Sequence, residues 1–118
     1  VLDPIWGYLM LGSNLVQGRS LGAWNFGPQE AVMVRDIIEH CQTLFGKKGN
    51  IRIEAPPFAE NQTLRLSSEK SKKHLQWSCR LDWREMLAWT LEDELALKKM
   101  APKKVIANRI DCYQRKWR

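Results

Sequence analysis

Residues that could carry out nucleophilic or acid–base chemistry are few in this sequence. Cys41 directly follows His40, and a thiol beside an imidazole is the pair that cysteine-dependent enzymes use. Because adjacent residues of a helix point in different directions, we expect these two to be ordinary helix side chains. Three consecutive carboxylates, Glu92, Asp93 and Glu94, should splay around a helix and form a solvated face. The sequence therefore predicts no catalytic residue and no metal site.

Motifs for cofactors are also missing. None of the seven glycines forms the Gly-x-Gly-x-x-Gly loop of a dinucleotide site, and no Walker loop or His-Glu-x-x-His is present. Cys41, Cys79 and Cys112 are widely spaced and odd in number, which predicts reduced structural thiols. No apolar stretch reaches the ~18 residues that span a bilayer, and no basic and apolar leader is present, so we expect a cytoplasmic protein.

Charge is distributed unevenly along the 118 residues. Residues 98–118 hold eight basic side chains and one acidic one, a net charge of +7. The other 97 residues hold 11 basic and 12 acidic side chains, a net charge of −1. The excess positive charge thus belongs to a terminal segment rather than to a binding face of the main body.

Two helices are predicted in the first half of the chain. Apolar residues recur at helical spacing over residues 4–17, where Asp3-Pro4 has the form of an N-cap and first helical position and Gly18 ends the helix. The second apolar stripe covers residues 32–45 and is followed by Gly46.

Two more long helices are predicted in the second half. Asp82 and Glu85 have the spacing of a capping box and start a helix that should reach about residue 100. Pro102 interrupts it, and the apolar residues of the basic tail beyond are spaced for a further amphipathic helix.

The region between these helices is expected to be less regular. A brief basic helix over residues 69–75 could be capped by Ser67 or Ser68. Alternating or extended patterns predict three short strands, at residues 23–26, 51–54 and 64–66. Together with the helices, these strands predict an α/β chain that is mainly helical with short strands.

Four blocks of sequence carry a family resemblance, in order and spacing, over roughly residues 1–95. They are Val1-Leu2-Asp3-Pro4 with Gly7-Tyr8-Leu9; Ala23-Trp24-Asn25-Phe26-Gly27-Pro28; Glu60 with Leu64-Arg65-Leu66; and residues 70–75 with Trp77. With these blocks the chain resembles the C-terminal portion of a CDP-glucose 4,6-dehydratase, an extended short-chain dehydrogenase/reductase. The block from Trp24 to Pro28 is the most specific.

The resemblance implies a parent lyase that oxidises the sugar at C4 with bound NAD, eliminates water across C5 and C6, and returns hydride to C6. In that family the glycine-rich loop and the Tyr-x-x-x-Lys pair lie in the N-terminal Rossmann portion, which has no equivalent here. The implied fold is a substrate-binding portion without its Rossmann core, over residues 1–97, followed by a basic extension over residues 98–118. This piece would hold no cofactor, and NAD would belong to the full-length enzyme.

Two residues are candidates for binding the nucleotide sugar. Asn25, between two aromatics before Gly27-Pro28, could present its amide to the substrate, and its alternative role is to cap a turn. Glu60 matches the acidic position of the family's His-Glu-Ala block, and its alternative is a solvated loop carboxylate. That block reads Ala59-Glu60-Asn61 here, and the family's Leu-Asp reads Leu66-Ser67, so a histidine and an aspartate are missing.

The partners follow from the same resemblance. A CDP-hexose is the expected small-molecule partner, and the apolar surface that a Rossmann portion would cover predicts either that portion or self-association. No membrane partner is expected. An alternative is a non-enzymatic module that binds an acidic partner or nucleic acid through the basic tail. Related nucleotide-sugar epimerases and reductases are a further possibility, because substrate-lid sequences discriminate them poorly.

Overall fold

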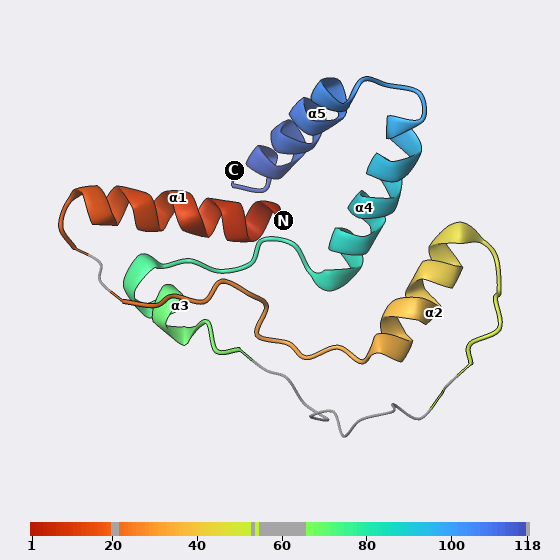
Figure 1. The fold of residues 1–118 in the computed structure, drawn as a ribbon, viewed down its shortest axis with the longest axis horizontal. Coiled ribbons are helices and arrows are strands. Elements are labelled where there is room, and N and C mark those ends of the chain that lie inside the picture. Colours follow the sequence, from red (N-terminus) through yellow and green to blue (C-terminus); the bar gives the residue numbers. More distant parts are fainter. Residues whose placement is uncertain (20–21, 53, 55–65, 118) are drawn as a thin grey trace.

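The computed structural model describes residues 1–19, 22–52, 54 and 66–117, and these residues form five helices (Figure 1). Their bounds are α1 Leu2–Val16, α2 Val34–Phe45, α3 Glu69–Leu75, α4 Trp83–Leu97 and α5 Pro102–Arg115. Each corresponds to a helix predicted from the sequence, α3 from its basic composition and a possible serine cap and the others from apolar spacing or capping signals. Local signals set one boundary of two helices as expected: Gly46 ends α2 with a left-handed φ of 62°, and Asp82 and Glu85 start α4 with a capping box.

The predicted strands are wrong wherever the structure describes them, so the described part of the chain is helical rather than α/β. Residues 23–26, the described residues 51, 52 and 54, and residue 66 belong to no strand, while residues 53, 64 and 65 lie outside the described residues. The physical reason is clearest at residues 23–27. The carbonyls of Ala23 and Asn25 accept hydrogen bonds from the side chains of Lys70 and Ser71, so this extended segment pairs with side chains instead of a second strand.

Asp3 does not cap α1, contrary to the prediction. The helix begins at Leu2 with Val1 as its N-cap and no side-chain cap. The Asp3 carboxylate instead accepts hydrogen bonds from donors outside the helix, the backbone N–H groups of Arg80 and Leu81, 2.9 and 3.2 Å away. These distant donors satisfy the buried carboxylate, so it is not available to the first turn of its own helix.

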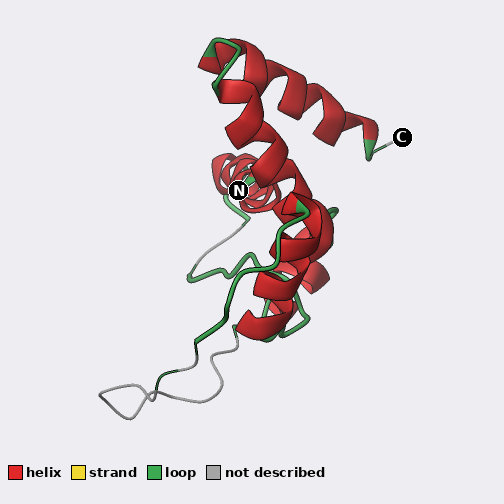
Figure 2. Cartoon of the chain, turned by 90° about the vertical axis from the view of Figure 1, so that its right-hand side faces the viewer, coloured by secondary structure: helices red, strands yellow, loops and turns green. Residues whose placement is uncertain are grey.

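The helices are arranged around a small core. α4 lies between α2 and α5, and α1 contacts α3 (Figure 1). Among the residues that the structure describes, five apolar or aromatic side chains are buried: Leu75, Trp77, Leu81, Val105 and Tyr113. Two of the five come from α5, so the basic segment of residues 98–118 contributes to the same core as residues 1–97. The arrangement is open (Figure 2), with a radius of gyration of 17.5 Å against the ~13.5 Å expected for this length.

Candidate functional site

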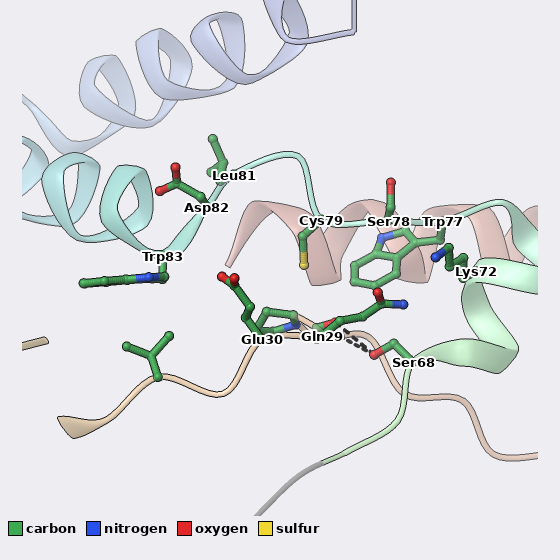
Figure 3. Close-up of a pocket in the computed structure, with 13 residues that line it drawn as sticks. Gln29, Glu30, Ser68, Lys72, Trp77, Ser78, Cys79, Leu81, Asp82 and Trp83 are labelled. Atoms are coloured by element: carbon green, nitrogen blue, oxygen red, sulfur yellow. Dashed lines mark hydrogen bonds between the residues drawn. The ribbon is translucent and has the colours of Figure 1, made fainter. Parts of the chain in front are cut away.

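A cavity of about 280 Å³ lies between residues 27–32, the start of α3 and residues 77–83 (Figure 3). Its apolar wall is formed by Trp77, Leu81 and Trp83, and polar side chains surround it. Lys72 and Trp83 stand at opposite ends of the cavity (Figure 3). This arrangement places a cationic group at one end and an aromatic ring at the other, with an apolar surface between them.

Two side chains from distant segments hold the walls together. The Ser68 hydroxyl accepts a 3.0 Å hydrogen bond from Gly27 N and donates a 2.9 Å bond to Gly27 O, which joins the start of α3 to the extended segment. Trp77 is 2% exposed, and its indole N–H donates to the backbone carbonyl of Asp3 at 3.0 Å. The walls of the cavity are therefore joined by hydrogen bonds between side chains and distant backbone groups.

Phe26 fixes the extended segment against α1. Its ring lies edge-on to Trp77 and to Tyr8, with centroids 5.2 and 5.4 Å away. It also lies directly over Gly7, which is buried. Only a residue without a Cβ allows the ring to approach α1 this closely. The aromatic block and the first block of the sequence are thus packed together at this point.

Asn25 lies beside the cavity rather than in its lining. Its amide nitrogen donates to the carbonyl of Ser67 at 3.2 Å, and its own carbonyl accepts the hydroxyl of the buried Ser71 at 2.5 Å. The side chain is exposed and links two segments 42 residues apart, which differs from a local turn cap. Glu60, the other predicted site residue, lies outside the described residues.

Charged groups around the cavity differ in their availability. Lys72 is exposed and is the only basic side chain among the described residues that line the cavity. The Asp82 carboxylate is engaged in the capping box, where it accepts the N–H of Glu85 at 2.8 Å. Glu30 contributes a further exposed carboxylate. An anionic group entering the cavity would therefore be attracted to the Lys72 end.

Cys79 forms part of the wall, and its surroundings keep it unreactive. Partial burial and, to a lesser degree, the negative charge of Asp3 raise the pKa of its thiol to about 11. The thiol is protonated at neutral pH and cannot serve as a nucleophile. Cys41, Cys79 and Cys112 form no disulfide bond in the structure. His40 packs edge-on against Trp83, 5.3 Å between centroids, so it is not a wholly surface residue.

The sequence predicts that the three adjacent carboxylates of α4 form a solvated face. In the structure two of the three bind an arginine of α5 instead. Arg109 of α5 binds Asp93 through Nε and Nη2, at 3.0 and 2.8 Å from Oδ1, and reaches Glu92 at 3.0 Å. Burial of the Arg109 guanidinium disfavours its charge, but these two carboxylates outweigh that effect and raise its pKa. Arg109 thus joins α5 to α4 through Glu92 and Asp93.

Sequence reasoning missed the residues that organise this region. Asp3, Ser68 and Tyr113 each contact a segment at least 41 residues away in the sequence. One signal in the sequence could have identified Asp3. An aspartate that lies among apolar residues at a helix start is expected to be buried, and a buried carboxylate needs hydrogen-bond partners.

Three kinds of site are absent from the part of the chain that the structure describes. No three His, Cys, Asp or Glu side chains there are grouped to hold a metal ion. No helix there has the length and apolar character needed to cross a membrane. Comparison of the chain with models of protein families, with curated proteins and with solved structures finds no match.

Proposed function

We propose that this chain is the nucleotide-sugar-binding portion of a 4,6-dehydratase that converts CDP-glucose to CDP-4-keto-6-deoxyglucose. It binds the substrate and has no catalytic competence alone, because the NAD loop and the catalytic tyrosine and lysine would belong to a Rossmann portion. The chief support is the convergence of three of the four resembling blocks. Phe26 packs on Gly7 of the first block, and Gly27 is bonded to Ser68 just before the lysine-rich helix, beside the cavity.

The cavity supports the proposal through its chemistry and its size. Its volume of about 280 Å³ is near the lower limit of small-molecule sites, which are about 300–1,000 Å³. It would therefore take one end of a nucleotide sugar and leave the rest outside. Lys72 would bind the diphosphate, and the Trp83 ring would offer an apolar face to the sugar or the base. In such a site the protein supplies binding and orientation, and the cofactor supplies the redox chemistry.

Titration calorimetry of the chain with CDP-glucose tests this function. Lys72→Gln should weaken binding by about 10- to 100-fold, because a hydrogen bond to a charged group contributes about 1.5–3 kcal/mol. The matched control is Lys73→Gln, since Lys73 is exposed in the same helix but does not line the cavity. UDP-glucose and GDP-mannose, titrated in parallel, report nucleotide selection. Absence of binding at millimolar CDP-glucose, or equal affinity of the two variants, would refute the proposal.

Asn25 needs a separate test because it has a structural contact. Asn25→Ala removes both the hydrogen bond to Ser67 and any hydrogen bond to the ligand. The Ser67 partner is a backbone carbonyl, so a side-chain change at Ser67 cannot remove this bond separately. We expect Asn25→Ala to lower the affinity for CDP-glucose more than it lowers the thermal midpoint of the free chain. A fall in stability with no change in affinity would assign Asn25 a purely structural role.

A second candidate function, binding of nucleic acid or another polyanion, is favoured by one observation. Four exposed lysines surround the turn from α4 to α5: Lys98, Lys99, Lys103 and Lys104. None of them forms an ion pair with the described residues. Because α5 contributes to the core, substitution is a better test than truncation. Changing all four to Gln should abolish binding of a single-stranded oligonucleotide, and wild-type affinity should fall steeply with salt. Binding that is insensitive to salt or to these changes would exclude this function.

A further inference from the structure

A groove of about 760 Å³ lies between α1 and α5, distinct from the cavity beside α3. Apolar side chains from both helices line it: Val1, Ile5 and Leu9 on one side, and Ile106, Ile110 and Trp117 on the other. The two helices meet through side chains, where Tyr113 bonds to Asp3 and the ring of Trp117 lies 4.7 Å from that of Trp6. Leu9 and Ile106 are 62% and 58% exposed, so the groove is open to solvent. Exposed apolar side chains gathered on two neighbouring helices make the groove a candidate interaction surface.

The groove carries almost no net charge, although the chain has a net charge of +6. Asp3 is the only charged residue of α1, and its side chain is buried and bonded. Asp93 and Arg109, the charged residues of the groove, neutralise each other through their salt bridge. A helix that is apolar on several faces is normally covered on those faces. The groove is therefore a surface that could meet a copy of itself without repulsion between like charges.

A single copy leaves apolar side chains on both sides of the groove exposed to solvent. Besides Leu9 and Ile106, Ile5 of α1 and Ile110 of α5 are 45% and 40% exposed. Among the described residues, five apolar or aromatic side chains are buried, so the core that these residues form is small. Association would supply the apolar burial that one copy lacks.

We propose that two copies of this chain associate through the α1–α5 groove, each covering the groove of the other about a two-fold axis. A two-fold interface brings the same patch of both subunits together, so the patch has to be self-complementary. The groove meets this requirement because its charges cancel, whereas the lysine-rich turn between α4 and α5 would bring like charges together. This proposal does not rest on the nucleotide-sugar proposal, under which a Rossmann portion would be the other candidate occupant of the apolar surface. A monomer that binds CDP-glucose and a dimer that does not are both possible results.

Analytical ultracentrifugation of the chain over a range of concentrations tests the dimer. We expect a reversible monomer–dimer equilibrium, and the double variant Leu9→Glu, Ile106→Glu should raise the dissociation constant at least 100-fold by placing four carboxylates in the interface. Met33→Glu is the matched control, because Met33 is 68% exposed but lies outside the groove. Since both groove positions are exposed in one copy, circular dichroism should show unchanged helix content.

A charge-reversal experiment tests whether the groove meets itself. The double variant Leu9→Lys, Ile106→Lys should also be monomeric, and mixing it with the Glu variant should restore a dimer. Should a variant misfold, hydrogen exchange of the wild-type chain above and below the dissociation constant gives the same answer. The dimer should protect amides of α1 and α5 and leave α2 unchanged. A wild-type chain that stays monomeric at 100 µM, or a dimer that persists in the Glu variant, would overturn the proposal.

Discussion

The hydroxyl of Tyr113 donates a 2.6 Å hydrogen bond to Oδ1 of Asp3, 110 residues earlier in the chain. Asp3 is 3% exposed and also accepts the backbone N–H groups of Arg80 and Leu81. Hydrogen bonds to an ionised carboxylate are stronger than those between neutral groups. One side chain therefore joins the start of α1, the segment before α4 and the end of α5.

Removing the Tyr113 hydroxyl should destabilise the whole chain. Tyr113→Phe deletes a buried donor to a carboxylate, which is expected to lower the free energy of unfolding by about 1.5–3 kcal/mol. Urea denaturation at pH 7 measures this loss. Tyr8→Phe is the matched control, because Tyr8 is 62% exposed, and its stability should stay within about 0.5 kcal/mol of wild type. Equal losses in both variants would contradict the importance of the bond to Asp3.

Two glycines of α1 should respond in opposite ways to alanine. A Cβ at Gly7 would lie 2.7 and 2.8 Å from two ring carbons of Phe26, whereas a Cβ at Gly12 would meet nothing within 4 Å. Gly7→Ala should therefore lower the free energy of unfolding by about 1–3 kcal/mol through overpacking. Gly12→Ala should raise it by about 0.5–1 kcal/mol through helix propensity. Thermal denaturation of both variants checks the contrast, and a stable Gly7→Ala variant would show that Phe26 is not held against α1.

Alkaline pH should weaken the fold through two groups. Burial, and then the bond to Asp3, raise the pKa of Tyr113 above its usual 10, and burial raises that of Cys79 from 9.0 to about 11. Both groups therefore lose their protons more readily in the unfolded chain, so the unfolded state binds fewer protons at high pH. Their effect on stability is constant below about pH 9 and becomes unfavourable as the pH rises through 11. Urea midpoints at pH 8 and 10.5 measure this fall, which should be smaller in the Cys79→Ala, Tyr113→Phe variant.

Cys79 should react slowly with thiol reagents. A pKa of about 11 instead of 9.0 leaves about 100-fold less thiolate at pH 8. In variants that each retain one cysteine, a disulfide reagent at pH 8 should label Cys112, which is exposed, at least 100-fold faster than Cys79. The rate ratio should collapse in 6 M urea, where burial no longer separates the two thiols. Equal rates in the native chain would rule out the shielding of Cys79.

The helices were predictable because their signals are local. The apolar spacing of residues 34–45 and the αL conformation that favours Gly46 depend only on neighbouring residues. The capping box of Asp82 and Glu85 is likewise complete within four residues. Such signals survive in any tertiary arrangement that leaves the helix intact.

The predicted strand at residues 23–26 is wrong because a strand, unlike a helix, depends on a partner elsewhere in the chain. Alternating aromatic residues favour an extended backbone, but a strand also needs a neighbouring strand to accept its hydrogen bonds. Here Ser68, Lys70 and Ser71 supply the bonds from another part of the chain. The extended conformation was thus foreseeable, and its partner was not.

The candidate site likewise combines features set by local sequence with features set by long-range contacts. The positions and ends of the helices, the uneven charge and the lack of a nucleotide-binding loop are properties of residue type and spacing, so the amino-acid order is sufficient to establish them. Three features depend on contacts across 41 or more residues. They are the set of atoms that meet at Asp3, the walls that Trp77 and Ser68 give the cavity, and the place of α5 in the core. These contacts form only when burial removes water from the polar groups and leaves distant donors as their remaining partners.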